Sequence, residues 1–231
     1  MKSSRGEHGE VEMKVGILGS GDVAKALGKG FLATGHEVML GSREADKVKG
    51  WSGDANGKHG TMTEAAAFGD LVVIAVKGTV AVEAVQGVAA GLEGKTVIDA
   101  TNPIANAPPV NGILQFFTGP NDSLMERLQA AVPGARFVKA FSCVGNPFMF
   151  KPNFPGGAPT MFICGNDEGA KETVRGVLSS FGWESEDIGK VEGARAIEPL
   201  CQLWCAPGML RGQWTHAFKL LKLAPAVAPA S

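Results

Sequence analysis

A glycine-rich stretch near the N-terminus carries the residues best suited to bind a charged ligand. Gly19-Ser20-Gly21-Asp22-Val23-Ala24 follows an apolar strand pattern and precedes a helical pattern over 22–34. Gly19 would allow a tight turn out of the strand, and Gly21 would let backbone amides approach a pyrophosphate at the helix N-terminus. Ala24 takes the third position, which the G-x-G-x-x-A form of this motif accepts. Because a strand and a helix flank the motif, the spacing predicts a dinucleotide-binding strand-helix-strand unit.

The end of the second strand, over about 37–40, indicates which dinucleotide would fit. NAD-selective sites place Asp or Glu there to hold the ribose 2′-hydroxyl, whereas this chain continues Gly41-Ser42-Arg43. Arg43 could stack on adenine and donate two hydrogen bonds to a 2′-phosphate, Ser42 could donate its hydroxyl, and Lys47 adds a positive charge. NADP is therefore the predicted cofactor. The alternative is that Arg43 and Lys47 are solvated surface charges.

Further cofactor contacts are predicted at the carboxyl ends of later strands, because ligands of doubly wound sheets bind in the crevice there. The strand over 71–76 ends in Ala75-Val76-Lys77, and the strand over 95–100 leads to Asn102. Asn102 could bond the carboxamide or ribose of the nicotinamide half, and Lys77 could contact a phosphate or the substrate. A solvated lysine and an Asn-Pro turn are the alternatives.

The loop after the strand over 136–141 mixes small polar and large apolar side chains, in the order Ser142-Cys143-Val144-Gly145-Asn146-Pro147-Phe148. Such a mixture suits one wall of a pocket for a flat ring system. Cys143, Asn146 and Phe148 are therefore predicted to line an acceptor pocket. The long loop over 104–120 is expected to be a lid or an interaction surface.

Composition limits the possible partners. The chain has 231 residues, 22 basic and 23 acidic groups and a formal net charge of -1, so neither a nucleic-acid surface nor a polybasic membrane face is expected. No apolar run approaches the roughly 20 residues that span a bilayer, and no signal peptide is recognisable, which predicts a cytoplasmic protein.

Cys201 and Cys205 are four residues apart and would lie on the same face of a helix, but no nearby His or second Cys pair completes a zinc site. Core packing is favoured, and no metal is predicted.

Alternating strand and helix patterns predict an α/β fold: a Rossmann-like, doubly wound, mostly parallel sheet with a C-terminal strand-helix extension. Residues 11–141 would form the dinucleotide-binding domain, and 142–223 would complete the sheet and the acceptor pocket. Flexible tails are expected at 1–10 and 224–231.

Two local features of the helices are also predicted. Thr63 is a candidate N-cap for a helix over 64–68. A terminal helical segment over 194–223, broken at Pro207-Gly208, is rich in Leu, Met and Trp. Because this segment offers more apolar surface than one sheet face needs, a homodimer contact is expected.

The chain has no tyrosine, so it cannot use the Tyr-Lys proton relay of short-chain dehydrogenases. His216 lies among hydrophobic residues, and no catalytic acid or base is predicted.

These residues carry a resemblance to a known family. The stretches that carry it are GILGSGDVAKALGKGFLATGHEVMLGSRE, DATNP, VKAFSCVGNPF, PTMFICGND and EGARAIEPL. Over about 13–222 the chain resembles the NADPH:coenzyme F-420 oxidoreductases, and the soluble nucleotide domain of membrane metalloreductases is similar. The resemblance implies a Rossmann-like fold, NADP bound at Ser20, Gly21, Asp22, Val23, Ser42, Arg43 and Lys47, and direct hydride transfer to a deazaflavin or flavin. The archaeal deazaflavin enzymes carry a histidine where this chain has Ser142-Cys143, so the acceptor stays open between F-420 and a flavin.

The residues and the resemblance together predict an NADP-dependent oxidoreductase with a flat hydride acceptor such as coenzyme F-420 or a flavin. The alternative is a non-catalytic NADPH-binding sensor or partner protein. The predicted cofactor-binding set is Gly19, Ser20, Gly21, Asp22, Val23, Ser42, Arg43, Lys47, Ala75, Val76, Lys77, Asn102 and Ala140.

Overall fold

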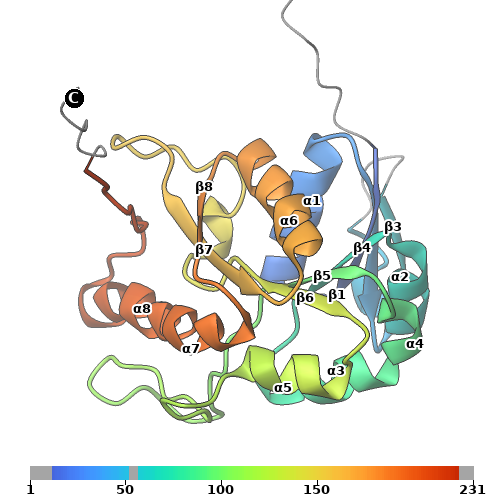
Figure 1. Cartoon of the computed structure of the whole chain (residues 1–231), viewed down its shortest axis with the longest axis horizontal. Helices are drawn as coiled ribbons and strands as arrows, with labels where there is room; N and C mark the ends of the chain where they lie inside the picture. The colour runs from blue at the N-terminus through green and yellow to red at the C-terminus, as the bar shows by residue number, and fades with distance from the viewer. Residues whose placement is uncertain (1–11, 52–56, 224–231) are drawn as a thin grey trace, which may run out of the picture.

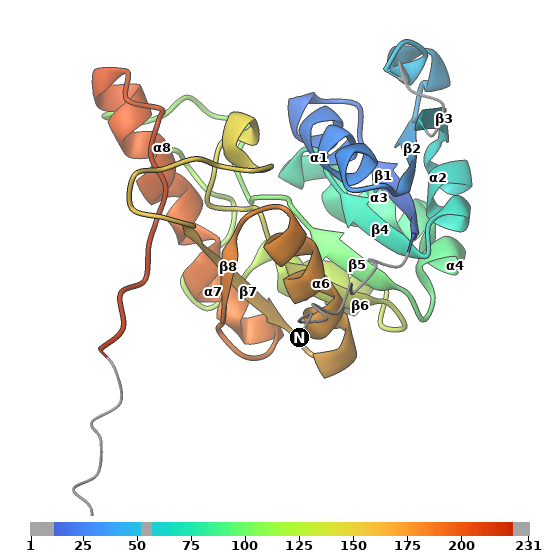
Figure 2. The ribbon, with the colours of Figure 1, turned by 90° about the horizontal axis from the view of Figure 1, so that it is seen from above.

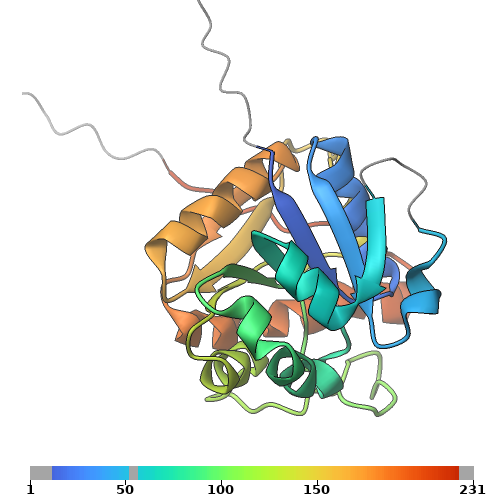
Figure 3. The same ribbon diagram turned by 90° about the vertical axis from the view of Figure 1, so that its right-hand side faces the viewer.

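The computed structural model describes residues 12–51 and 57–223, so the predicted tails at 1–10 and 224–231 lie outside the described residues. One eight-stranded sheet runs through the molecule in the order β3-β2-β1-β4-β5-β6-β7-β8 (Figure 1). The strands are β1 Lys14–Leu18, β2 Glu37–Ser42, β3 Gly57–Thr61, β4 Leu71–Ile74, β5 Thr96–Asp99, β6 Arg136–Lys139, β7 Thr160–Gly165 and β8 Glu184–Asp187. The first six strands are parallel, as Figure 3 shows for β1, β2 and β3 (dark blue to cyan). The predicted α/β fold with a mostly parallel sheet is confirmed.

The sheet does not end at the predicted domain boundary. β7 pairs antiparallel with β6, and β8 pairs parallel with β7. The division of the chain at residue 141 stays a prediction. Within the described residues, no helix is both long enough and apolar enough to cross a membrane.

Helices cover both faces of the sheet (Figure 1). One face packs against α1 and α6, and the other against α2, α3, α4, α5 and α7. Their bounds are α1 Asp22–Ala33, α2 Met62–Phe68, α3 Ala81–Gly87, α4 Ala89–Leu92, α5 Leu124–Ala131, α6 Glu168–Ser180, α7 Ala194–Ile197 and α8 Pro199–Arg211, with 3-10 turns η1 Ala45–Val48, η2 Gly78–Val80, η3 Asn146–Phe148 and η4 Val191–Gly193. The central strands are apolar on both faces because both are covered.

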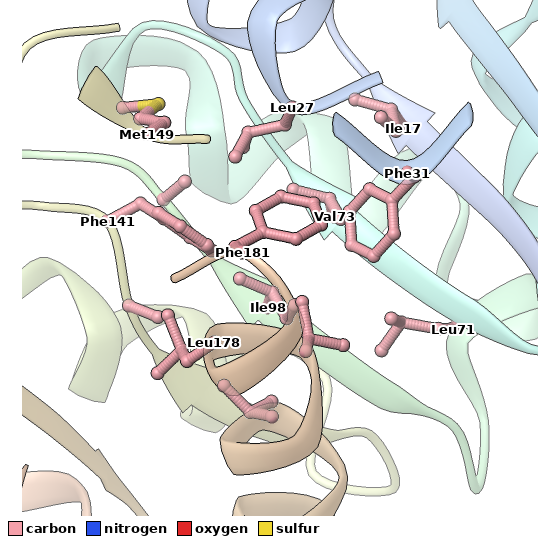
Figure 4. Close-up of a cluster of buried hydrophobic side chains, with 14 of the residues drawn as sticks. Ile17, Leu27, Phe31, Leu71, Val73, Ile98, Phe141, Met149, Leu178 and Phe181 are labelled. Atoms are coloured by element: carbon pink, nitrogen blue, oxygen red, sulfur yellow. The ribbon is translucent and has the colours of Figure 1, made fainter. Parts of the chain in front are cut away.

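An aromatic cluster anchors α1 to the sheet (Figure 4). The ring of Phe31 in α1 lies 4.9 Å from that of Phe181, which in turn lies 6.0 Å from that of Phe141 after β6. All three side chains are buried. Such pairs add about 0.5–1.5 kcal/mol beyond their buried area. The helix that carries the glycine motif therefore has a fixed position over the sheet.

Two predictions about helix ends are wrong. The N-cap of α2 is Thr61, not Thr63: Thr61 Oγ1 accepts from the Glu64 amide at 3.2 Å, and Glu64 Oε2 accepts from the Thr61 amide at 2.7 Å. β3 turns directly into α2, so the last strand residue is the cap. The predicted break at Pro207-Gly208 is also absent, since α8 continues to Arg211 and ends at Gly212 with φ 69°. Pro207 lies inside this helix, so the hydrogen bond that an amide at this position would donate to the Leu203 carbonyl is missing there.

Residues 213–223 are not helical either. This segment passes the first residue of β7, where the Thr160 amide donates to the Phe218 carbonyl at 2.9 Å and the Leu220 amide donates to Thr160 Oγ1 at 3.1 Å. The prediction of a helix to Leu223 fails because these contacts give the backbone partners outside a helix.

The long predicted loop after β5 contains an ordered hairpin. Ala105 donates to the Gln115 carbonyl at 2.8 Å, and the Val110 and Ile113 backbones bond each other at 2.9 and 3.0 Å. Between them, Asn111 and Gly112 have φ of 48° and 79°, the signs that a two-residue type I′ turn requires. We call residues 103–117 the hairpin.

Candidate cofactor site

A cavity of about 670 Å³ opens at the carboxyl ends of β1, β2 and β4. Most of the predicted cofactor-binding residues line it, from four separate segments of the chain. These are Gly19, Ser20, Gly21, Ser42, Arg43, Lys47, Ala75, Val76 and Lys77. The carboxyl edge of a doubly wound sheet is where nucleotides bind, so the cavity lies in the expected place.

Glycine is favoured at the two motif positions for different physical reasons. Gly19 has φ 148°, and a Cβ there would overlap the carbonyl of Ala75 and lie 3.3 Å from Ala24 Cβ. Packing within the protein therefore requires Gly19. A Cβ on Gly21 would meet no described atom within 4 Å. Packing does not require Gly21, whereas the close approach of a phosphate would.

The first turn of α1 faces the same cavity without a side-chain cap. Gly21 is the N-cap residue, and no side chain of the described residues bonds the amides that follow it. These amides and the positive end of the helix dipole suit a pyrophosphate. Gly21, the open space beside it and the uncapped helix together fit a dinucleotide.

The rim at the end of β2 is basic. Ser42 is buried and its hydroxyl accepts from the Glu44 amide at 3.3 Å, while Arg43 is exposed and forms no ion pair with the described residues. Lys47 Nζ lies 2.8 Å from Glu44 Oε1, and this hydrogen bond lowers the pKa of Glu44. A 2′-phosphate would therefore compete with Glu44 for Lys47, whereas Arg43 is available to it.

Sequence reasoning missed the residues of α2 and α3 that line the cavity. Met62 of α2 and Val80, Ala84 and Val88 around α3 line the cavity, as does Glu83. The last three apolar positions are spaced by four residues and so share one helix face. This spacing can be seen in the sequence, but a helix that packs against the core has the same spacing, so the pattern could not identify a pocket.

The other predicted residues are not among those that line this cavity. Asp22 is exposed and Val23 half-buried in the first turn of α1, and Ala140 is fully buried after β6. Asn102 is half-buried, and its Nδ2 donates to the Ser142 carbonyl at 3.0 Å.

The predicted acceptor-pocket residues differ in their burial. Asn146 and Phe148 are half-buried in η3, on the loop that lies between α1 and α8 (yellow, Figure 2). Cys143 instead points into the core, with its sulfur 3.9 Å from Met161 Sδ, and burial raises the pKa of its thiol to about 11. Cys143 as a pocket residue stays a prediction, and in this structure its side chain lies in the core.

A buried charged cluster near Asn102 had no signal in the sequence. Lys139 Nζ lies 2.7 Å from Asp99 Oδ2 and 2.9 Å from Glu198 Oε1, with all three side chains buried. Burial alone would lower the pKa of Lys139, but the two carboxylates outweigh it and raise that pKa. From sequence alone, a lysine within a strand predicts a charge at the surface, because the carboxylates that would pair with it are distant in the chain.

We also searched the described residues for a metal site and for a second cleft that could hold a nucleotide. Within residues 12–51 and 57–223, no group of three or more His, Cys, Asp or Glu side chains could hold a metal. A second cleft of about 870 Å³ lies beside β8, but it lacks a glycine-rich loop and its charged walls pair with each other, as Glu184 does with Lys219 and Glu172 with Arg175. The cavity at the ends of β1, β2 and β4 is therefore the stronger candidate for a nucleotide site.

Comparison with known proteins shows which oxidoreductases the chain is similar to. Residues 14–103 match the family model described as NADP oxidoreductase coenzyme F420-dependent. The chain is 29% identical over 201 residues to the metalloreductase STEAP3 of Rattus norvegicus, covering 85% of this chain but only 39% of that protein. It is 27% identical over 206 residues to the F420-dependent NADP reductase of Methanocaldococcus jannaschii, covering 83% and 90%.

A solved structure agrees with these relatives. A candidate F420-dependent NADP reductase from Arthrobacter sp. FB24 superposes with a TM-score of 0.81 at 27% identity, over 91% of this chain and 100% of that chain. The match of residues 14–103 contains the glycine motif, Arg43 and Asn102. Over these residues, the chain is similar to the coenzyme F420-dependent NADP oxidoreductases.

Proposed function

We propose that this protein transfers hydride between NADP(H) and a flat ring acceptor such as coenzyme F-420 or a flavin. The observation that carries the proposal is the cavity itself. It combines an open glycine, an uncapped helix N-terminus and a rim where Arg43 directly follows β2, while Glu44 beside it is bonded to Lys47. The F420-dependent NADP reductase among the relatives supports the choice of acceptor class.

The residues present divide between the parts of the cofactor. Gly21 and the first amides of α1 would hold the pyrophosphate, and Ser42 and Arg43 would hold the 2′-phosphate. The apolar wall formed by Val80 and Ala84 would cover the adenine. Asn102, after β5, would meet the nicotinamide half.

The chemistry asks little of the side chains. When bound, NADPH supplies the hydride, and a stacked ring accepts it without a separate proton relay in the protein. The task of these residues is to bind, to orient the two rings and to exclude water between them. Loop 142–150, between α1 and α8, offers Asn146 and Phe148 as the wall for the second ring.

The direct test is to mix the protein with NADPH and, separately, F-420, FMN, FAD or a quinone, and to follow NADPH absorbance. Oxidation with a ring acceptor is expected. Gly21→Val is the matched control: its side chain would enter free space, costing at most about 1 kcal/mol as a poorer N-cap, yet would block the phosphate. It should remain folded and lose turnover.

Absence of oxidation with every acceptor would refute hydride transfer. Tight NADPH binding without turnover would favour the second candidate, a non-catalytic NADPH-binding sensor. The exposed apolar side chains of α8, Leu203, Met209 and Leu210, favour that candidate because a partner protein could cover them.

A further inference from the structure

The buried cluster around Lys139 is fully bonded. Lys139 Nζ donates to Asp99 Oδ2 at 2.7 Å and to the Thr101 carbonyl at 2.9 Å, and it lies 2.9 Å from Glu198 Oε1. These partners use all three ammonium hydrogens. Lys139 and Asp99 are completely shielded from water.

The cluster has two carboxylates for one ammonium, and the backbone supplies the remaining bonds. Glu198 accepts from the Leu124 and Met125 amides, both at 3.0 Å, in the first turn of α5. Asp99 Oδ1 accepts from the amide and the hydroxyl of Thr101 at 2.9 and 2.6 Å. The cluster thereby joins β5, β6, α5 and the start of α8 in one rigid arrangement.

Stability alone explains such a cluster poorly. Removing charges from water costs several kcal/mol per ion, and apolar residues of similar volume often serve a fold as well. A buried ionic cluster can instead specify one geometry. The geometry fixed here is that of the two loops after β5 and β6, since Thr101 and Lys139 stand at the start of each.

These two loops hold the unsatisfied polar atoms. Asn102 Nδ2 donates to the Ser142 carbonyl at 3.0 Å, which leaves Asn102 Oδ1 as an acceptor and Ser142 Oγ as a hydroxyl. Among the described residues, these are the buried side-chain oxygens and nitrogens without a hydrogen-bond partner. Ser142 is only 2% exposed. An unmade buried bond costs about 1–3 kcal/mol, so a ligand that supplies both partners would be favoured.

A primary carboxamide has the matching groups: its NH₂ can donate to Asn102 Oδ1 and its C=O can accept from the Ser142 hydroxyl. We propose that Asn102 and Ser142 receive the carboxamide of the nicotinamide ring, and that Lys139, Asp99 and Glu198 are positioning residues that hold both loops for it. This inference rests on the proposed NADP site. Both atoms are shielded in the present conformation, so the carboxamide enters with a rotation of the half-buried Asn102 side chain.

Ser142→Ala tests the receptor directly. It removes a hydroxyl that has no partner in the ligand-free protein, so the midpoint of thermal unfolding should stay the same or rise. NADPH should bind about tenfold more weakly, the loss of one hydrogen bond, while 2′,5′-ADP, which lacks the nicotinamide, should bind unchanged. Unchanged NADPH binding, or equal weakening of both ligands, would overturn the assignment of Ser142.

Glu198→Gln tests the positioning residues, with Glu126→Gln as its matched control. Glu126 lies in the same first turn of α5 but pairs with Arg195 at the surface, outside the cluster. Glu198→Gln should weaken NADPH selectively over 2′,5′-ADP and lower kcat more than it raises KM for the acceptor, whereas Glu126→Gln should do neither. A fall in thermal stability with unchanged ligand selectivity would make the cluster purely structural and overturn its positioning role.

The two proposals fail in different ways. A wild-type protein that binds neither NADPH nor 2′,5′-ADP would refute the NADP site itself. Binding of both ligands, with no selective effect of Ser142→Ala, would refute only the carboxamide receptor. If Glu198→Gln does not fold, the binding ratios of Ser142→Ala still decide the receptor.

Discussion

Single residues at the cavity rim set the expected cofactor preference. Arg43 is exposed at the end of β2 and unpaired within the described part of the chain, whereas Lys47 is already bonded to Glu44. A guanidinium can donate two hydrogen bonds to a phosphate in a fixed geometry, which an ammonium cannot. Arg43 should therefore contribute most of the discrimination between NADPH and NADH.

We expect Arg43→Ala to weaken NADPH binding by about 2 to 3 kcal/mol through the loss of charge-assisted hydrogen bonds, and to change NADH binding little. Fluorescence titration of both cofactors measures this. Lys49→Ala is the control, because Lys49 is an exposed cation six residues away that does not line the cavity. An equal loss for NADPH and NADH would contradict the 2′-phosphate assignment.

At the scale of elements, the junction of β3 and α2 brings residues of α2 to the cavity. Thr61 ends the strand, caps the helix and lines the cavity together with Met62 and Thr63. The reciprocal bonds between Thr61 and Glu64 fix the angle at which the helix leaves the sheet. The same bond from the Thr61 amide lowers the pKa of Glu64.

We expect Thr61→Ala to lower the free energy of unfolding by about 1 kcal/mol, the usual cost of losing an N-cap. Thr63→Ala, two residues further along the chain, should change the free energy of unfolding by no more than about 0.5 kcal/mol, because Thr63 is not the cap. Urea denaturation of the two variants gives both values. If Thr61→Ala lowers the free energy of unfolding no more than Thr63→Ala does, the capping box contributes little.

At the scale of the whole molecule, the hairpin and α8 form one surface. Gln202 of α8 donates to the Leu114 carbonyl at 2.7 Å, and Gly112 lies against the Leu210 side chain. Around this contact Val110, Leu203 and Leu210 are 54–58% exposed. The hairpin is therefore fixed to α8, and it presents apolar groups to the outside.

The homodimer predicted from the sequence stays a prediction, and this surface is where we would test it. We expect the wild-type protein to be a dimer by light scattering and Leu203→Glu to shift it to monomer, because the charge would be buried in the contact. Leu221→Glu, on the segment that passes the first residue of β7, is a matched exposed position outside this surface and should leave the dimer intact. A monomeric wild type, or a dimer that survives Leu203→Glu, would refute the prediction.

The sequence alone determined the parts of the protein that depend on neighbours along the chain. The strand, glycine turn and helix of 14–33 follow from local periodicity and from the backbone freedom of Gly19, and the succession of strands and helices along the chain follows from alternating patterns. The end of β2 in Gly41-Ser42, followed by Arg43 and not by Asp or Glu, is likewise a local fact. These features were predictable because each depends on a short window of residues.

Only the tertiary structure decided which distant residues meet. Lys139 and Glu198 are 59 positions apart, and their carboxylate-ammonium contact has no periodic signature in the sequence. The direction of Cys143, the cap at Thr61 and the cavity face of α3 likewise depend on packing across the sheet. The physical reason is common to all of these: a strand or helix pattern specifies that a face is covered, but the partner that covers it is set by the close packing of the whole fold.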